Sequence, residues 1–507
     1  ELFTLAGELG TSDFGPTLFT ASAEKVYEYN ATQMVLNTAW SGVLLPDYTD
    51  YLDNSTFASV EAPLRKYIST ITTLAGIKGG PCTQQAQSNS TKCIEDIVIK
   101  METTLAETAQ PATDDEYDKH YSLKYGEAVA KYPLTYGALT QGMGFLQKAG
   151  APITKDTVVT FNSLPYMGRV EKVVAALDLQ ELKLYYEFLY VNKYADLLGE
   201  PFVAAKFAFF DTALQGTASR PPRSQTCTET LIAQFPDLIG KYYYEKMFDN
   251  KRQRSVQDMV KTIEKTMSEH INAVTWLDAP TRAAALAKLA KVSNLIGGST
   301  QNRTYPFVLT RDNYFGNIQT IQAAEWTRLL GKINKPVDRT EWPMSPATAN
   351  SFYSDGNLAD WWSNSSAEAF EIRAQCMRDQ YSSFTAYALS GAVGKVDGDL
   401  TIGENIADNG GLSVAYDAYH EWVKTAPTFD THGVTNDEVD KLFYVSYSQM
   451  YCDKMRDETQ KQRLVSNVHA PGMWRVNGVL MNHDPFAKTF QCKAGSKMNP
   501  ANKCKIW

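Results

Sequence analysis

The sequence predicts a mainly α-helical protein built from two lobes. From Ser22 to about Asn334, apolar residues recur every three or four positions, with short polar stretches between the runs, as packed helices require. Residues 335–346 then contain three prolines within eleven positions, which interrupts any helix. Helical patterns return after this break. We therefore predict an N-terminal lobe of residues 1–335 and a C-terminal lobe of residues 336–507.

Three segments carry the helical pattern of the N-terminal lobe most clearly. Residues 170–190 repeat apolar side chains at the spacing of a buried helix face. Residues 255–274 place six apolar side chains on one stripe: Val256, Met259, Val260, Ile263, Met267 and Ile271. A further helix starts after Asp278, which can cap it, has Pro280 in its first turn and continues to Val292.

The C-terminal lobe is predicted to contain at least two helices. Residues 367–389 and residues 412–426 both read as helices. The tail after Val468 is rich in Gly, Pro and Asn but retains large aromatic side chains. We expect it to be irregular in backbone and nevertheless ordered.

Composition excludes several classes of protein. The 507 residues include 49 Lys and Arg and 57 Asp and Glu, for a formal net charge of −8, and 44% are hydrophobic. These values are ordinary for a globular protein with a sizeable core. An acidic chain argues against a nucleic-acid surface, which would need a basic stripe. The sequence contains no run of 18 apolar residues, so no membrane span is predicted. The first residues lack the basic flank and the apolar block of a signal peptide.

Five N-x-[ST] triplets favour a secreted glycoprotein, although so short a pattern also arises by chance. They begin at Asn30, Asn54, Asn89, Asn302 and Asn364. Cys82 and Cys93 flank a polar loop that a local disulfide would close. The total of seven cysteines is odd, which in a secreted protein indicates a free thiol, an intermolecular bond or missing partners.

The most informative stretch is G-E-N-I-A-D-N-G-G at residues 403–411. Glu404 and Asp408 are four positions apart, so on a helix both carboxylates lie on one face. Like charges at this spacing repel, and a metal ion, a histidine or an arginine would offset the repulsion. The alternative is a solvated acidic helix start, which the helix dipole favours.

At this point the sequence resembles the neprilysin-like zinc metallopeptidases, family M13. E-N-I-A-D at 404–408 matches the family's E-N-x-A-D motif, and N-S-F-Y at 350–353 is similar to its N-A-[FY]-Y. Further matches are D-G-N-L-A-D-W-W at 355–362, H-A-P-G-M-W-R at 469–475, and the ending M-N-P-A-N-K-C-K-I-W at 498–507. The likeness is dense over 340–507 and sparse but collinear elsewhere.

The resemblance implies a fold and a set of site residues. Two helical lobes would enclose a central cavity, with a small β content in the C-terminal lobe. Zn²⁺ would be bound by two histidines of an H-E-x-x-H helix and by Glu404, and Asp408 would accept a hydrogen bond from a ligand imidazole. His469 would stabilise the tetrahedral intermediate.

Substrate contacts and disulfides are also implied by the resemblance. Asn350 and the backbone at Ser351 would hold an extended peptide, and Arg475 would grip a substrate carbonyl. Cys376 would pair with Cys504, and Cys82 with Cys93. The remaining cysteines, Cys227, Cys452 and Cys492, would have partners upstream of this sequence.

One departure from the family pattern is serious, because no H-E-x-x-H occurs among the six histidines. In the family this helix lies between N-A-[FY]-Y and D-G-x-L-x-D-W-W, whereas here Ser354 is followed directly by Asp355. By resemblance, roughly fifty residues are absent, including two zinc ligands and the general base. One carboxylate does not hold catalytic zinc, which takes three protein ligands and a water. As given, the chain should bind no zinc and hydrolyse no peptide.

Two explanations of this gap remain open at the level of sequence. The protein is either a form that lacks the segment, or a part of a longer parent that carries it. In the first case the chain is a non-catalytic peptide-binding or structural extracellular protein. In the second the parent is an extracellular or cell-surface zinc endopeptidase acting on peptides. A subunit of a larger extracellular assembly is a further possibility.

Overall fold

The computed structural model describes residues 2, 4–5, 18–26, 29–82, 87–109, 120–144, 153–298, 303–342, 361–425, 433 and 435–507. The chain divides into two compact units. The first comprises the described residues of Glu1–Gln234 and Gln301–Glu341, and the second those of Phe235–Thr300 and Ala359–Trp507. The structure thus groups residues 235–300 with the C-terminal residues, whereas the sequence placed them in the N-terminal lobe.

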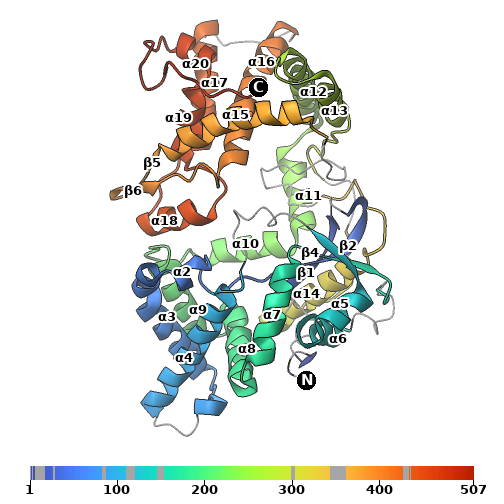
Figure 1. The fold of residues 1–507 in the computed structure, drawn as a ribbon, viewed down its shortest axis with the longest axis vertical. Helices are drawn as coiled ribbons and strands as arrows, with labels where there is room; N and C mark the ends of the chain where they lie inside the picture. The colour runs from blue at the N-terminus through green and yellow to red at the C-terminus, as the bar shows by residue number, and fades with distance from the viewer. Residues whose placement is uncertain are drawn as a thin grey trace. The chain divides into compact units, whose positions relative to one another are not determined.

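A four-stranded sheet lies in the first unit (Figure 1). Its strands, in the order β1-β2-β4-β3, are β1 (Phe19–Val26), β2 (Asn30–Trp40), β4 (Val158–Phe161) and β3 (Tyr121–Lys124). β2 pairs antiparallel with β1 and parallel with β4. The prediction of helix from Ser22 onward is wrong here, because β1 alternates buried and exposed side chains with the period of two that one sheet face requires.

Helices make up most of the first unit. They are α2 (Thr49–Leu52), α3 (Asn54–Leu74), η1 (Gly80–Cys82), α4 (Gln87–Ala106), α5 (Tyr125–Lys131), η2 (Pro133–Gly137), α6 (Ala138–Gly142), α7 (Leu164–Ala176), α8 (Leu179–Tyr194), η3 (Ala195–Leu197), α9 (Glu200–Lys206), η4 (Phe207–Ala213), α10 (Arg223–Gln234) and α14 (Tyr314–Leu330). Their apolar faces and the sheet form one continuous core that includes Leu36, Phe161 and Trp326.

The second unit is also mainly helical. Its elements are α11 (Pro236–Met247), α12 (Asn250–Ala273), α13 (Ala279–Leu289), α15 (Asn364–Ser382), β5 (Thr385–Ala388), β6 (Gly391–Lys395), α16 (Ile402–Thr425), α17 (Asn436–Met450), α18 (Asp457–Ser466), α19 (Gly472–Leu480) and α20 (Asp484–Thr489). The predicted mainly α fold is therefore confirmed, and the antiparallel β5–β6 hairpin supplies the small β content expected in this part of the chain.

Individual element predictions have mixed outcomes. The helix expected over 255–274 is α12, and Asp278 caps α13 as predicted, accepting from the Thr281 N–H at 2.8 Å. Residues 170–190 instead belong to two helices, because Asp178 caps a new one at Leu179. The helix expected over 367–389 ends at Ser382, where β5 follows, and the tail contains α19 and α20.

Contacts between α12–α13 and the C-terminal residues explain why the structure groups them. Helix α12 packs against α16. The Trp276 Nε1–H donates to the Ile506 carbonyl at 2.9 Å. The Asp278 N–H donates to the Ser366 hydroxyl at 3.1 Å. These contacts join residues that are about ninety to more than two hundred positions apart, which no local pattern in the sequence reveals.

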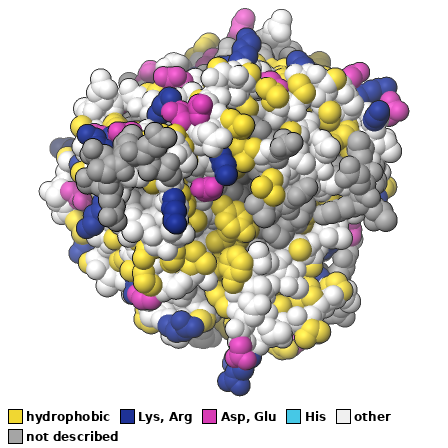
Figure 2. Space-filling view, turned by 90° about the horizontal axis from the view of Figure 1, so that it is seen from below, with side chains coloured by type: hydrophobic (Ala, Val, Ile, Leu, Met, Phe, Trp, Pro, Cys, Tyr) yellow, Lys and Arg dark blue, Asp and Glu magenta, His cyan; other side chains and the backbone are white. Residues whose placement is uncertain are grey.

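The structure can be compared with two classes that the composition excluded, nucleic-acid-binding proteins and membrane-spanning proteins. On the face of the molecule shown in Figure 2, basic and acidic side chains lie interspersed. Within the described part of the chain, no helix has both the length and the apolar character needed to cross a bilayer.

Candidate functional site

Helix α16 positions the two acidic residues that the sequence singled out. Glu404 and Asp408 lie in its first turns, one helical turn apart and therefore on one face. Asn405, the residue after Glu404, is buried, and its Nδ2 donates to the Thr401 hydroxyl at 2.8 Å. This buried side chain helps to fix the rotation of the helix start, which leaves Glu404 partly exposed and Asp408 almost buried.

Asp408 forms a bidentate ion pair with Arg475 of α19. The Arg475 Nε and Nη2 donate to the two carboxylate oxygens, each at 2.7 Å. The Asp408 and Arg475 side chains are only 9% and 20% exposed. The guanidinium also stacks on the Tyr451 ring, 4.6 Å from its centroid. The hydrogen bonds to Asp408 raise the pKa of Arg475 above its already high ordinary value, so the guanidinium stays charged.

Glu404 contacts His469. Its Oε2 lies 3.2 Å from the His469 Nε2. The other ring nitrogen, Nδ1, lies 3.0 Å from the Asn467 Oδ1, which also accepts from the His469 backbone N–H at 2.9 Å. Both side chains are 37% exposed, so water screens this contact and it contributes little to stability.

The two contacts answer the question that the carboxylate spacing raised. Repulsion between Glu404 and Asp408 required a positive partner, and metal, histidine and arginine were the candidates. In the structure each carboxylate has its own basic partner, His469 for Glu404 and Arg475 for Asp408. All four residues predicted from the C-terminal motifs therefore meet in one place. The predicted contact between Asp408 and a ligand imidazole is replaced here by the contact with Arg475.

The remaining predicted substrate residues, Asn350 and Ser351, lie outside the described residues, as do Ser354 and Asp355. Their roles stay predictions. Among the predicted glycosylation positions, Asn54 and Asn364 are exposed and Asn30 is partly exposed. Asn302 lies outside the described residues, as does the side chain of Asn89 in α4.

The residues present at the site do not fit a catalytic zinc ion. Both oxygens of Asp408 are occupied by Arg475, which leaves Glu404 and His469 as donors. Among the described residues, no group of three His, Cys, Asp or Glu side chains is close enough to hold a metal ion. Catalytic zinc takes three protein ligands and keeps a fourth position for water.

Sequence reasoning missed the aromatic side chains that support Arg475. Tyr451 lies under its guanidinium, and the Tyr447 hydroxyl donates to the Arg475 carbonyl at 2.8 Å. Burial raises the pKa of Tyr451, so its ring stays neutral and its face available to a cation. Both tyrosines belong to or follow α17, more than twenty residues before Arg475, and only a Y-x-x-x-Y spacing marks them in the sequence.

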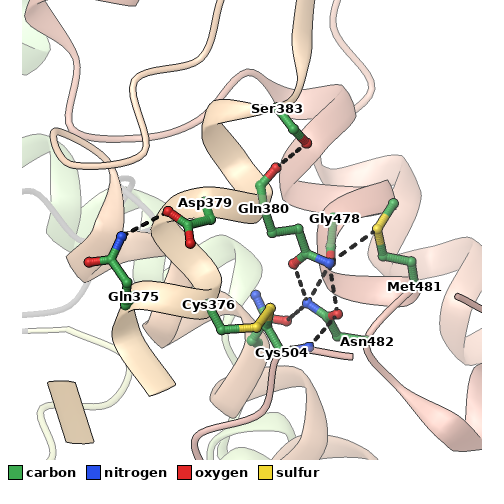
Figure 3. Close-up of a disulfide and its surroundings, with 10 residues drawn as sticks. Gln375, Cys376, Asp379, Gln380, Ser383, Gly478, Met481, Asn482 and Cys504 are labelled. Atoms are coloured by element: carbon green, nitrogen blue, oxygen red, sulfur yellow. Dashed lines mark hydrogen bonds between the residues drawn. A yellow bond between two sulfur atoms is a disulfide. The ribbon is translucent and has the colours of Figure 1, made fainter. Parts of the chain in front are cut away.

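Both predicted disulfides are present. Cys82 pairs with Cys93 and Cys376 with Cys504, with Cα separations of 5.8 and 5.6 Å. Figure 3 shows the second bond beside Asn482, whose Oδ1 accepts from the Cys504 backbone N–H at 3.1 Å. The Asn482 Nδ2 donates to Asn409 of α16 at 3.0 Å. The disulfide therefore holds Cys504 to α15, and the Asn482 amide links Cys504 to α16, the helix that carries Glu404 and Asp408.

Comparison with known proteins places the chain in a family. Two family models, both described as peptidase family M13, match residues 1–299 and residues 347–506. The chain belongs to peptidase family M13. M13 members are zinc metallopeptidases, and the family prediction made from the motifs is confirmed.

Several curated relatives align with nearly all of this M13 chain. Endothelin-converting enzyme 1 of Cavia porcellus is 26% identical, and the alignment covers 94% of this chain and 70% of the relative. An endothelin-converting enzyme homolog of Locusta migratoria is 25% identical over 92% of this chain and 71% of its own length. The Cavia alignment runs over 551 positions, more than the 507 residues of the whole chain. The relative thus has residues inside the matched span that have no counterpart here.

Solved structures share the M13 fold. The zinc metalloprotease Zmp1 of Mycobacterium tuberculosis, in complex with an inhibitor, matches with a TM-score of 0.87 and 23% identity, covering 100% of this chain and 82% of its own. PepO of Lactobacillus rhamnosis HN001 gives a TM-score of 0.82 at 21% identity, covering 100% and 84%. A Haemonchus galactose containing glycoprotein complex gives 0.69 at 18% identity, covering 99% and 85%.

Proposed function

We propose that this chain, in the form given by its sequence, is an M13 member that binds peptides without hydrolysing them. Hydrolysis would belong to a longer parent that carries a zinc-ligand helix between Ser354 and Asp355. The observation that carries the proposal is the pairing of Asp408 with Arg475, which leaves one carboxylate and one imidazole where the family's zinc needs three ligands. The relatives' extra residues support the same interpretation.

Peptide binding rests on Arg475. Its Nε and Nη2 are engaged by Asp408, while Nη1 has no hydrogen-bond partner among the described residues. An arginine held in this way presents the remaining N–H groups in a fixed direction, so little side-chain entropy is lost when a peptide carbonyl accepts from them. His469 lies on the same side of α16, where its contact with Glu404 is exposed enough to be exchanged for a ligand.

We further propose that the chain is an extracellular or cell-surface glycoprotein. Two disulfides form in its structure, and such bonds persist mainly in oxidising compartments. Two of the five N-x-[ST] triplets, at Asn54 and Asn364, have exposed asparagines. Peptides are the expected ligands, as the peptidase family suggests.

The test compares the chain as given with a parent form. Purified chain should contain no stoichiometric zinc by mass spectrometry and should not cleave a quenched fluorescent peptide. It should bind the same peptide in a fluorescence anisotropy assay. Arg475→Met should weaken that binding about tenfold, or about 1.4 kcal/mol, whereas Arg311→Met in the first unit should leave it unchanged. One zinc per chain with peptide cleavage would overturn the proposal.

The parent form is tested separately. The transcript is sequenced across the codons for Ser354 and Asp355, and any longer product is expressed. A product with an H-E-x-x-H helix should bind zinc, and Glu404→Gln should abolish that binding. Unchanged zinc content in the Glu404→Gln variant would contradict the assignment of Glu404 as a ligand. A transcript that reads directly from Ser354 to Asp355 would mean that the non-catalytic form is the encoded protein.

A further inference from the structure

Two of the candidate glycosylation triplets occupy the same position in two different helices. Asn54 is the first residue of α3, directly after the N-cap Asp53. Asn364 is the first residue of α15, directly after the N-cap Ser363. Both asparagine side chains are exposed. The triplets differ in the exposure of the hydroxyl residue two positions after the asparagine: Thr56 is exposed, whereas Ser366 is 0% exposed.

Ser366 is buried by a cluster of hydrogen bonds around Asp278, which we call the Asp278 clamp. The Asp278 N–H donates to the Ser366 hydroxyl at 3.1 Å. The Asp278 carboxylate accepts from the Ser363 hydroxyl, and from the Ser365 hydroxyl at 3.2 Å. The same carboxylate accepts from the Thr281 N–H at 2.8 Å. One side chain therefore caps α13 and also holds the first turn of α15.

Attachment of an N-linked glycan needs the asparagine amide and the later hydroxyl together. The Asn Nδ2 forms a bond to the anomeric carbon of a lipid-linked oligosaccharide and loses one proton. The bond from that carbon to the pyrophosphate oxygen breaks, the lipid pyrophosphate leaves with the electron pair, and the amide proton passes to solvent. The hydroxyl two residues on is part of the acceptor pattern. In a helix, residues i and i+2 point about 200° apart, so the first turn must unwind before a transferase can contact both.

Unwinding has different consequences in the two helices. In α3, residues 54–56 are already exposed, and the lost interactions are cap hydrogen bonds from Ser55 and Thr56 to Asp53. In α15, Ser366 must leave a fully buried position and the Asp278 clamp must break. Local opening of a terminal turn is frequent when its side chains are exposed and rare when they are buried.

We propose that Asn364 is a glycan acceptor only until the second unit folds, and that closure of the Asp278 clamp ends its modification, whereas Asn54 stays an acceptor in the folded protein. A glycan attached earlier is compatible with the fold, because the Asn364 side chain points to solvent. Occupancy at Asn364 then reports the competition between transfer and folding. This inference rests on the proposed extracellular location.

The first test uses folded, unglycosylated protein and purified transferase with a lipid-linked oligosaccharide. Thr56→Ser converts the Asn54 triplet to Asn-Ser-Ser, identical to the triplet at Asn364, so only structure differs between the two. Mass spectrometry should find a glycan at Asn54 and none at Asn364. After denaturation and reduction, both positions should be modified. Equal modification of both positions in the folded protein would overturn the proposal.

The second test weakens the clamp in secreting cells. Asp278→Ala should raise the glycan occupancy at Asn364 towards that at Asn54 and leave Asn54 unchanged. The control, Asp249→Ala, removes the cap of α12 away from any triplet and should change neither position. Occupancy at Asn364 that is unaffected by Asp278→Ala would contradict the role of the clamp. Absence of glycan at both positions in cells would refute the extracellular location. The experiment with purified transferase would still decide whether closure of the Asp278 clamp prevents modification of Asn364.

Discussion

The two units of the chain bury their apolar side chains in different ways. In the first unit one continuous cluster joins the sheet to the surrounding helices. In the second unit the described apolar side chains form three smaller clusters, around Tyr381, Tyr444 and Ile271. Between and beside these clusters lie the polar contacts of Asp408, Arg475, Asn482 and the Asp278 clamp. The unit with the divided core is the one that carries the candidate site.

This difference indicates where each unit derives its stability. A single core is stabilised mainly by burial of apolar surface, and each large apolar side chain contributes about 1.5–3 kcal/mol there. A divided core depends more on cross-links and on hydrogen bonds between distant segments. It is also the arrangement expected if the parent has a helix that packs in the second unit and is absent from this chain. The following predictions test the contrast from the largest effect to the smallest.

Loss of a disulfide should cost the second unit more than the first. Cys376 and Cys504 are 128 positions apart, whereas Cys82 and Cys93 are 11 apart. In the chain-entropy description, closing these loops stabilises the fold by about 5 and about 3 kcal/mol, respectively. Serine replacement of each pair, followed by urea denaturation with hydrogen exchange read separately for each unit, measures both. Equal losses would show that the second unit does not depend on its cross-link in this way.

Truncation of a core aromatic side chain, unlike loss of a disulfide, should destabilise the first unit more than the second. Phe161 lies in the continuous core of the first unit, and Phe384 stacks on Trp474 in a small cluster of the second. Phe161→Ala should lower the free energy of unfolding of its unit by about 4 kcal/mol, and Phe384→Ala by about 3 kcal/mol. Val308→Ala, at an exposed position of the first unit, is the control and should have little effect. A larger loss for Phe384→Ala would contradict the contrast.

Mild acid should weaken the second unit and strengthen the first. Burial lowers the pKa of His483 from 6.5 to about 4, so the unfolded chain takes up a proton first. The stability due to neutral His483 is complete above pH 6.5 and is lost as the pH falls towards 4, by about 3 kcal/mol. Burial raises the pKa of Glu102 in the first unit. Its contribution is complete below pH 4.5 and is lost as the pH rises.

Unfolding of each unit between pH 4 and pH 7 checks these signs. His483→Gln should flatten the pH dependence of the second unit, and Glu102→Gln that of the first. The same dependence before and after substitution would show that other groups control it.

Much of this architecture could be predicted where its cause is local. The cap at Asp278, helix α12 and the shared face of Glu404 and Asp408 follow from short-range spacing, and the family resemblance supplied the disulfides. The sheet was missed because residues 19–40 carry no turn signal that separates their alternation from helical runs. The pair of Asp408 and Arg475 joins residues 67 positions apart. The family resemblance assigned both residues to one site, but no pattern in the sequence indicated that they would pair with each other.

The assignment of residues 235–300 failed for the same reason. Position along the chain suggested the N-terminal lobe, because the proline-rich break comes later. The contacts that decide it, from Trp276 to Ile506 and from Asp278 to Ser366, are tertiary. Such contacts override sequence order whenever a unit is built from separated segments.

The long separation in sequence between Asp278 and its partners in the Asp278 clamp also has a consequence during synthesis. Asp278 precedes Ser363 by 85 positions, and the intervening α14 belongs to the other unit. At about 5–20 residues per second, a ribosome needs about 4–17 seconds to produce the partners of α13 after Asp278 has been made. During this interval α12 and α13 lack the C-terminal residues that later pack against them. A chaperone that shelters nascent chains would therefore have a binding site at this stretch for that interval.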